Sequence, residues 1–432
     1  MMQNTKVKKT GRGKRREWVL GVGLMAGLVG FVFRIPLSRM IGDKGVGFFA
    51  PAMEIFMVSS AMMCYGISKA VAILVKYRAK RDMYKSARKI YQSALVFTIL
   101  FSALMTLFVF FFSEFIAQTF ILEYRGYLAI AAIAPAILLS GLLGVMRGYL
   151  QGMGAMMPTI HSRLLEKFVM LVAGLLLAAA SFSYGEKVAA LLRNTEYAAA
   201  YGAMGASIGV SVACAIGILH IILIRLIYAG TFKQQLMNDT AKYVESNGQV
   251  ISTFFSAALP YMICALLYNI HYLVDQRVFN YAMNKQDKGG IRVAHWGVYY
   301  GKYSVVTGIV AIICTMSAVL VIPRIAQMYD KQEYGEVKYR IGSAIHNLAV
   351  LTIPCAVWVA VLAEPIVKML FTGDQDTAVK LLQTGSGVIV FFTFGYFLML
   401  LMQRIRKIRM VILGGLAAFL IHLIFLFVLI SS

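Results

Sequence analysis

Residues 95–112 read L-V-F-T-I-L-F-S-A-L-M-T-L-F-V-F-F-F, a run without a charged side chain. A hydrocarbon core about 30 Å thick needs roughly twenty apolar residues in an α-helix, so this run has the composition and approximate length of a membrane-spanning helix. Similar runs recur along the chain, which has 432 residues, 60% hydrophobic and 14% charged. A soluble domain has roughly a quarter of its residues charged. The sequence therefore predicts an integral membrane protein with no soluble catalytic domain.

Along the whole chain, the hydrophobic pattern predicts about eleven transmembrane helices joined by short loops. They span residues 18–37, 49–75, 91–112, 125–146, 159–181, 199–226, 251–276, 299–322, 343–363, 378–402 and 410–430. The first run continues from Trp18 past Arg34 and Pro36 without a small-residue cleavage site, so we interpret it as a retained helix and not as a signal peptide. The predicted fold class is an all-α integral membrane protein.

Basic residues set the predicted orientation. The formal net charge is +23, and most Lys and Arg residues lie in alternate loops, which the positive-inside rule places in the cytoplasm. Residues 1–17 are a basic cytoplasmic segment, and an odd helix count then places the C-terminus outside. The 276–302 segment is the main exception, because it is predicted to be outside but is also basic. Charges confined to short loops do not form the basic face of a nucleic-acid-binding module, so nucleic acid is not expected as a partner.

A faint internal repeat predicts two pseudo-repeated lobes around a central cavity. The I-S-K-A at 67–70 aligns with I-P-R-I at 322–325, an offset of 322 − 67 = 255, and Gln151 aligns with Gln403 at 403 − 151 = 252. The N-lobe is expected to comprise residues 18–250, with helices 1–6 and a cytoplasmic linker, and the C-lobe residues 251–432. The counterpart of helix 6 would begin near 199 + 252 = 451, so the second lobe is expected to be one helix short.

The sequence carries no enzyme or cofactor signature. It has no Walker A loop, no H-E-x-x-H and no G-x-S-x-G motif. The five cysteines never pair as C-x-x-C, and they lie in or beside apolar spans. We therefore expect no catalytic residues, no cofactor and no metal.

Several motifs occur in a specific order. The first half contains R-I-P-L-S-R-M-I-G-D-K-G-V-G at 34–47, G-I-S-K-A-V-A at 66–72 and R-G-Y-L-Q-G-M-G-A-M-M-P-T at 147–159. The second half contains L-P-Y at 259–261, V-I-P-R-I-A at 321–326 and L-A-E-P-I-V-K-M-L-F at 362–371. In these motifs and their spacing the chain resembles the multidrug/oligosaccharidyl-lipid/polysaccharide exporter superfamily, in its stage V sporulation protein B-like and lipid II flippase-like branch.

This resemblance implies a flippase that moves a lipid-linked saccharide, such as an undecaprenyl-diphosphate-linked precursor of peptidoglycan or another polysaccharide, across the bacterial cytoplasmic (inner) membrane. Transport would proceed by alternating access between the two lobes. Lipid-linked saccharide, membrane lipids and other envelope-synthesis proteins are the partners implied. The chain departs from the pattern at its C-terminus, where relatives have twelve or fourteen helices. It also has R-I-R-K at 404–407 in place of a second glycine- and proline-containing loop.

Basic residues near the predicted spans are candidates for substrate binding. Arg34 lies inside helix 1, where a lipid-facing charge costs roughly 2.5–3.5 kcal/mol, and a guanidinium binds phosphate bidentately. Its alternative role is to snorkel to the interface. Lys69 and Arg324 occupy equivalent positions in the repeat alignment. They are predicted to form a basic rim at the inner, cytoplasmic end or, alternatively, to anchor at lipid headgroups. Arg39 and Arg277 complete the proposed binding set.

His271 and Asp275 are the candidates for ion coupling. Their i, i+4 spacing puts the imidazole and the carboxylate on one helix face, where they could bind a coupled proton or cation or simply fix helix packing. Glu54 is a further candidate for a charge buried in the membrane. Residues 42–47 are glycine-rich and predict a hinge or cap that includes Gly42, Asp43, Gly45 and Gly47.

Three rival functions stay open at this point. A cation-coupled multidrug exporter of the same superfamily would use acidic cavity residues, and the sequence has few intramembrane carboxylates. A membrane-embedded glycosyltransferase or ligase would need a large outer loop, which the sequence lacks. A scaffold of an envelope-synthesis complex would not transport lipid at all, and a reconstituted flipping assay would distinguish it.

Overall fold

The structure is a computed structural model, and it describes residues 25–239, 245–286 and 288–431. Throughout these ranges the regular structure is helical and no strand occurs, which confirms the all-α membrane fold class. The basic segment 1–17 and the first residues of the predicted helix 18–37 lie outside the described residues.

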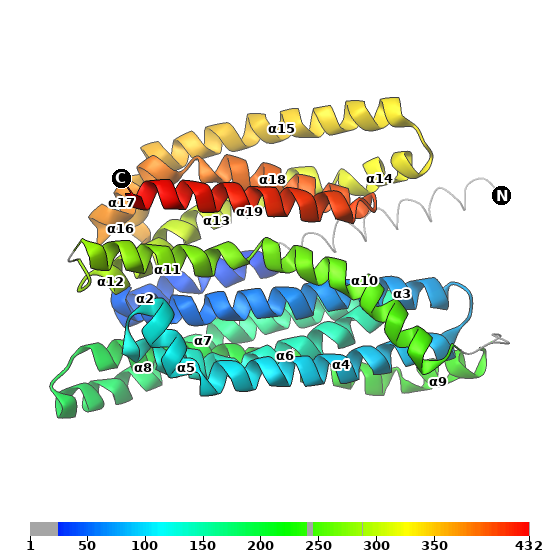
Figure 1. The fold of residues 1–432 in the computed structure, drawn as a ribbon, viewed down its shortest axis with the longest axis horizontal. Helices are drawn as coiled ribbons and strands as arrows, with labels where there is room; N and C mark the ends of the chain where they lie inside the picture. Colours follow the sequence, from blue (N-terminus) through cyan, green and yellow to red (C-terminus); the bar gives the residue numbers. More distant parts are fainter. Residues whose placement is uncertain (1–24, 240–244, 287, 432) are drawn as a thin grey trace. The chain divides into compact units, whose positions relative to one another are not determined.

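Residues 25–32 are helical, and the labelled elements follow from Arg34. They are α2 (Arg34–Ser60), η1 (Ala61–Ile67), α3 (Ser68–Ala79), α4 (Tyr84–Phe111), α5 (Ser113–Ile116), η2 (Ala117–Ile121), η3 (Tyr124–Gly126), α6 (Tyr127–Gly152), α7 (Met156–Leu192), α8 (Glu196–Ile227), α9 (Ala229–Met237), α10 (Asn247–Leu267), α11 (Ile270–Lys285), α12 (Arg292–Val298), η4 (Tyr299–Tyr303), α13 (Ser304–Val319), α14 (Ile322–Asp330), α15 (Tyr334–Val361), α16 (Ala363–Leu370), α17 (Gln375–Gly385), α18 (Val388–Arg404) and α19 (Ile408–Ser431). Figure 1 shows these elements coloured along the chain.

The described residues contain nine helices long and apolar enough to cross a membrane, or ten if α17 and α18, bent by 57°, form one span. The expected count of eleven is therefore not confirmed. One helix fewer is counted because Met25–Ala79 is one 55-residue helical stretch that contains the described part of 18–37 and all of 49–75. The count of nine also leaves out the bent pair of α17 and α18. At 1.5 Å per residue the Met25–Ala79 stretch is about 80 Å long, more than twice the hydrocarbon thickness. Its backbone leaves the helical conformation at Gly42 (φ 70°, ψ 176°), so two helices join there.

The chain divides into two compact units. Unit 1 comprises the chain up to Arg39 together with Val298–Val411, and unit 2 comprises Met40–Gly297 together with Ile412–Ser432. These boundaries follow spatial contact, whereas the expected lobes 18–250 and 251–432 follow the sequence repeat. In unit 2, residues 251–297 of the second half of the repeat pack with helices of the first half. The repeat-based lobes stay a prediction.

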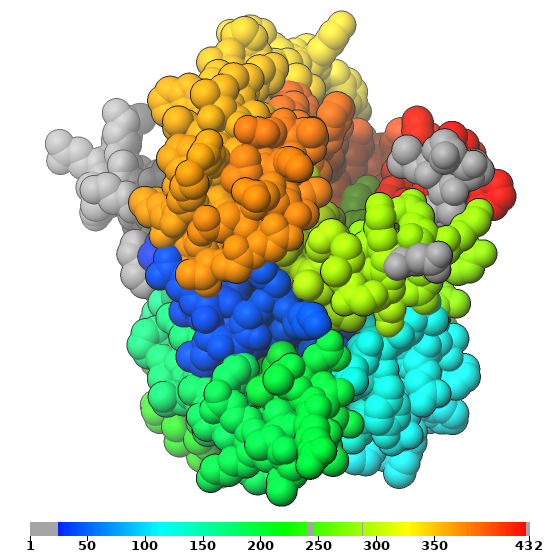
Figure 2. Space-filling view, turned by 90° about the vertical axis from the view of Figure 1, so that its left-hand side faces the viewer, coloured from blue at the N-terminus to red at the C-terminus, as the bar shows by residue number. Residues whose placement is uncertain are grey.

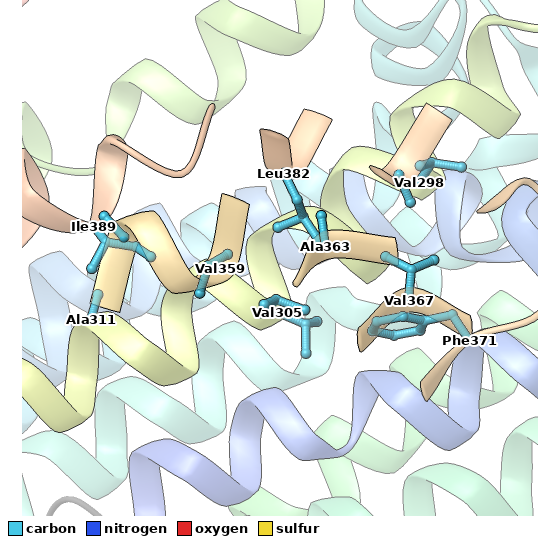
Figure 3. Packing of buried hydrophobic residues seen from close by; sticks show 12 residues of the cluster. Val298, Val305, Ala311, Val359, Ala363, Val367, Phe371, Leu382 and Ile389 are labelled. Atoms are coloured by element: carbon cyan, nitrogen blue, oxygen red, sulfur yellow. The ribbon is translucent and has the colours of Figure 1, made fainter. Parts of the chain in front are cut away.

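Interdigitating apolar side chains form the core of unit 1. Figure 3 shows Phe371, which follows α16, beside Val367 of α16, and Ile389 of α18 beside Ala311 of α13. Val305 of α13 and Val359 of α15 belong to the same cluster. Phe371 is 1% exposed and Ile389 is fully buried. Lipid is as apolar as these side chains, so the hydrophobic effect does not drive membrane helices together. Close packing of this kind holds them instead. The core fixes α13 and η4 against the turn after α16.

Glycines let the helices of unit 2 approach closely. A Cβ at Gly205 of α8 would lie 2.2 Å from the Leu177 carbonyl oxygen of α7, and one at Gly209 would lie 2.3 Å from the Cα of Gly174. The i, i+4 spacing of the two α8 glycines is the small-residue pattern of tightly packed membrane helices. Glycines of α6 pack in the same way: a Cβ at Gly148 would lie 2.6 Å from the carbonyl oxygen of Ser68 in α3.

A buried ion pair also lies in this bundle. Arg147 of α6 is 2% exposed, and its Nη2 lies 2.8 Å from Glu166 Oε2 of α7. The same guanidinium donates to Ser162 Oγ, which donates to the Gly217 carbonyl of α8. Local pairing thus accounts for the charges of Arg147 and Glu166 in the membrane, and these residues connect three helices of unit 2.

Candidate functional site

Arg34 begins α2 and lies against η4 in unit 1. Its Nη1 donates to the Tyr300 carbonyl at 3.3 Å and to Ser304 Oγ at 3.1 Å. The guanidinium carbon lies 3.9 Å from the Tyr300 ring centroid and 5.1 Å from the Phe31 ring centroid, which is cation–π geometry. The side chain is only 9% exposed. A buried guanidinium is thus held by a carbonyl, a hydroxyl and two aromatic rings.

Two further cations of unit 1 bind backbone carbonyls near the end of α16. Arg39 donates to the carbonyls of Met369 and Leu370 at 2.8 and 2.9 Å. Lys302 of η4 is fully buried and donates to the carbonyls of Thr372 and Asp374 at 2.7 and 3.0 Å. The last carbonyls of a helix lack intrahelical donors and carry its negative dipole end, so they attract cations. Sequence reasoning did not identify Lys302 as a binding residue.

The charges of Arg34 and Arg39 are not neutralised by carboxylates. Within the described ranges, neither side chain forms an ion pair with Asp or Glu; each is held by neutral acceptors. A neutral acceptor orients a guanidinium without cancelling its charge. This part of unit 1 is therefore suited to attract an anion.

The other predicted binding residues lie elsewhere. Arg324 is exposed on α14 in unit 1, whereas Lys69 of α3 and Arg277 of α11 are half-buried in unit 2. Arg277 Nη1 has no hydrogen-bond partner among the described residues. Arg34 and Arg39 therefore lie on one helix, five residues apart and bound to different groups, while the basic rim of Lys69 and Arg324 stays a prediction.

The partner of Asp275 is a histidine that the sequence pattern did not identify. Asp275 Oδ1 lies 2.5 Å from His422 Nε2, which comes from α19. The rings of His271 and His422 have centroids 6.1 Å apart, and the His271 ring lies 4.0 Å from that of Tyr272. The predicted pair of His271 and Asp275 therefore forms part of a larger cluster on α11 and α19. In the sequence, His422 could have been noticed as the lone polar residue in the otherwise apolar run 410–430.

Glu54 is bound from the same helix that carries Asp275. Trp296 Nε1 lies 3.2 Å from the Gln276 amide, whose other end lies 3.0 Å from Glu54 Oε2. An indole N–H can only donate, so the amide oxygen must face Trp296 and the amide nitrogen must donate to Glu54. Glu54 is 1% exposed. Unit 2 thus holds a buried carboxylate beside the Asp275 cluster, since Gln276 follows Asp275 directly.

The glycine-rich segment 42–47 combines a backbone break with tight packing. Only Gly42 has a positive φ, and no atom lies within 4 Å of a Cβ built there. A Cβ at Gly47 would lie 2.0 Å from the Val293 carbonyl oxygen, and one at Gly297 would lie 1.9 Å from the Asp43 carbonyl oxygen. A Cβ at Gly45 would meet its own helix neighbour Ile41 at 2.7 Å. Gly42 therefore breaks the helical backbone, whereas Gly47 contacts α12, and a hinge in this segment stays a prediction.

The side chains of the described residues offer no metal site, since no group of three or more His, Cys, Asp or Glu is arranged to hold an ion. The chemistry available is instead ionic: uncompensated guanidinium groups in unit 1, and carboxylate and imidazole groups in unit 2. Such groups can bind an anionic cargo and a coupled proton or cation.

Comparison with known proteins identifies two curated relatives from Bacillus subtilis (strain 168). Stage V sporulation protein B is 23% identical over 368 residues, which cover 84% of this chain and 67% of the relative. Lipid II flippase MurJ is 22% identical over 401 residues, which cover 88% of this chain and 69% of the relative. Both matches extend across most of the chain.

Solved structures share the fold. An inward-facing multidrug resistance transporter of the MATE family, in the MOP superfamily, has a TM-score of 0.67 at 12% identity, covering 92% of this chain and 84% of the other. A MOP superfamily transporter from Pyrococcus furiosus has a TM-score of 0.61 at 13% identity, covering 97% and 87%. The sequence profile described as polysaccharide biosynthesis protein matches residues 16–329. Because this match covers well over half of the 432 residues, the chain is a multi-pass membrane protein that belongs to the polysaccharide biosynthesis protein family, within the multidrug/oligosaccharidyl-lipid/polysaccharide exporter superfamily.

Proposed function

We propose that this protein translocates an anionic, undecaprenyl-diphosphate-linked saccharide across the bacterial cytoplasmic membrane by alternating access of two lobes. The observation that carries the proposal is the environment of Arg34, a buried guanidinium held by neutral groups and two aromatic rings. The name of one curated relative, lipid II flippase MurJ, supports the class of cargo. The proposed activity is transport and needs no catalytic residue, metal or cofactor.

Arg34 and Arg39 of unit 1 are proposed to bind the diphosphate first, because they retain their positive charge and their guanidinium groups can hold phosphate oxygens bidentately. Lys69, Arg277 and Arg324 are proposed as further contacts during movement. Gly42 is the proposed hinge, and Asp43, Gly45 and Gly47 are its proposed flanks. If the lipid carries roughly two negative charges, an inside-negative potential of about 100 mV favours its outward movement by roughly 4–5 kcal/mol.

The function can be tested in vesicles that contain the purified protein and a fluorescent undecaprenyl-diphosphate disaccharide. We expect the fraction of lipid accessible to an impermeant quencher to change at least about tenfold faster than in protein-free vesicles. Equal rates of lipid movement in vesicles with and without the protein would instead support the scaffold alternative.

A cation-coupled multidrug exporter is a second candidate, and the buried carboxylate of Glu54 is the observation that favours it. Acidic groups inside a membrane can bind cationic compounds. Export of a cationic dye from the same vesicles separates the two functions, since the flippase proposal predicts no dye transport.

We also propose that Asp275, with His422 and His271, binds a proton or cation coupled to transport. Asp275→Asn is expected to remove the response of lipid movement to an imposed proton or sodium gradient, because the amide cannot change charge. The matched control is Glu364→Gln on α16, whose exposed carboxylate pairs with Lys368 within one helix turn. A full gradient response in Asp275→Asn would show that the pair merely fixes α19 to α11.

The N-terminus is proposed to be cytoplasmic and the C-terminal Ser431-Ser432 to be outside, as the alternating loop charges require. A reporter that is active only in the cytoplasm should be active when fused before Met1 and inactive when fused after Ser432. Activity at both ends would mean an even number of spans. The error would then be expected in the 251–302 region, where the basic bias is weakest.

A further inference from the structure

Five charged side chains form an alternating ion chain in unit 2. Lys44 Nζ lies 2.6 Å from Glu196, whose second oxygen lies 2.7 Å from Arg125. Arg125 also lies 2.5 Å from Glu123, whose second oxygen lies 3.6 Å from Arg292. The order is cation, carboxylate, cation, carboxylate, cation. We call this set the ion chain; it has one more positive than negative charge.

The ion chain has more donors than acceptors. Arg292, which begins α12, is 7% exposed and also donates to Asn284 Oδ1 at 2.9 Å, to the Gly289 carbonyl at 2.8 Å and to the Leu122 carbonyl. Even so, the Nε atoms of Arg292 and Arg125 are buried and have no acceptor among the described residues. Buried N–H groups are normally paired, so two guanidinium donors in one cluster are left for a ligand with further acceptor oxygens to satisfy.

The ion chain connects segments from the two halves of the predicted repeat. Lys44, Glu123, Arg125 and Glu196 belong to the first half, whereas Arg292 belongs to the second. Figure 2 shows the yellow-green α11–α12 segment against the cyan segment that contains α5 and η2. Asn280 Nδ2 of α11 donates to the Phe120 carbonyl of η2 at 3.4 Å. Lys44 lies in α2 two residues after the backbone break at Gly42, and the other four residues lie in loops or at helix ends. The charge pattern predicts all five positions to be outside.

We propose that the ion chain is an exit-side binding site for the diphosphate group of the cargo, occupied in this structure by the protein's own two carboxylates. This inference rests on the proposed function. The diphosphate of the cargo has four non-bridging oxygens, as many as Glu123 and Glu196 have together, and its bridging and ester oxygens are further acceptors. It can accept bidentately from both arginines, including their unpaired Nε groups. When diphosphate displaces the carboxylates, Arg292 separates from Glu123 and the second-half segment is released from the first half. Exchange of the carboxylates for diphosphate therefore binds the departing headgroup and separates the two segments at the end of unit 2 that is predicted to be outside.

The first test uses inorganic pyrophosphate as the probe and the Glu123→Gln/Glu196→Gln double variant of the full chain. Because the two carboxylates are tethered competitors at high effective concentration, their removal should tighten pyrophosphate binding by about tenfold or more at constant ionic strength. Titration calorimetry measures this affinity. Glu364→Gln removes a carboxylate from an exposed pair within α16 and should leave the affinity for pyrophosphate unchanged. Equal affinity in the double variant and the native protein overturns the proposal.

The second test keeps all five charges and does not depend on the double variant folding. Val293 is 8% exposed and packs against Gly47, directly beside Arg292. In a chain whose five native cysteines are replaced by alanine, a Val293→Cys thiol reports whether this contact opens. We expect pyrophosphate to accelerate its reaction with an impermeant maleimide several-fold over sodium chloride of matched ionic strength. Equal acceleration by both salts would mean simple screening and would refute a diphosphate site.

Neither experiment measures lipid movement, so the two proposals can fail separately. Pyrophosphate binding that depends on the ion chain, in a protein that moves no lipid, would retain the site and reject the flippase function. Lipid movement without any pyrophosphate effect would retain the function and reject this site.

Discussion

Arg34→Ala is expected to abolish movement of the diphosphate-linked lipid while leaving membrane insertion and yield close to those of the native protein. The substitution removes the buried positive charge that Tyr300, Ser304 and Phe31 orient. Truncating one partner of a desolvated charge pair costs roughly 2–5 kcal/mol, so transport should fall by about thirtyfold or more. Arg34→Lys should retain part of the rate, since lysine binds phosphate as a point charge. Arg34→Glu should repel the diphosphate and be fully inactive.

The control for Arg34 is a basic residue with a different predicted role. Arg81 lies in the loop after α3, exposed and 4.0 Å from the Tyr77 ring centroid. Its charge is shared with other basic residues of that loop, so Arg81→Ala should transport at nearly the native rate. Normal lipid movement by Arg34→Ala at native abundance would exclude a phosphate-binding role and favour a snorkelling arginine.

Gly297→Ala is expected to be the most disruptive methyl addition in unit 2. A Cβ at this position would lie 1.9 Å from the Asp43 carbonyl oxygen and 2.9 Å from the Gly47 amide nitrogen. The obstacle is backbone rather than a flexible side chain, so α12 must move away from α2. Such overpacking costs typically about 1–3 kcal/mol and occasionally more. Thermal unfolding in detergent, followed by size-exclusion chromatography, should show a marked loss of stability.

Gly414→Ala is the matched comparison, since it adds the same methyl group to another helix. No atom lies within 4 Å of a Cβ built at Gly414 in α19. Alanine is favoured over glycine in a helix interior by roughly 0.5–1 kcal/mol, so this variant should be as stable as the native protein or slightly more stable. If the two variants melted alike, the close approach of α2 and α12 would be incorrect.

The long helices could be predicted from sequence because each carries a continuous apolar run. The expected helices 91–112, 159–181 and 199–226 lie within, or extend by a residue beyond, α4, α7 and α8. The observed helices are longer because polar residues at their ends continue the helical backbone beyond the hydrocarbon length. Two expected helices instead lie in one stretch that is interrupted only at Gly42, because the segment expected as a loop is helical on both sides of that glycine.

The candidate site was only partly predictable. Arg34 and Asp275 stood out because a charge inside an apolar run is costly. Their partners did not, because hydrogen bonds to the carbonyls of Tyr300 or Thr372 leave no sequence pattern. His422 lies 147 residues from Asp275, and Lys302 resembled an ordinary loop lysine until its burial was known. Long-range pairing therefore required the fold.

The most direct test of the central claim is a structure of the protein with a bound undecaprenyl-diphosphate saccharide. We expect diphosphate oxygens within about 3 Å of the Arg34 guanidinium, with Arg39 as a second contact. A headgroup bound away from Arg34, or a cationic compound bound against Glu54 in its place, would contradict the proposed role of Arg34.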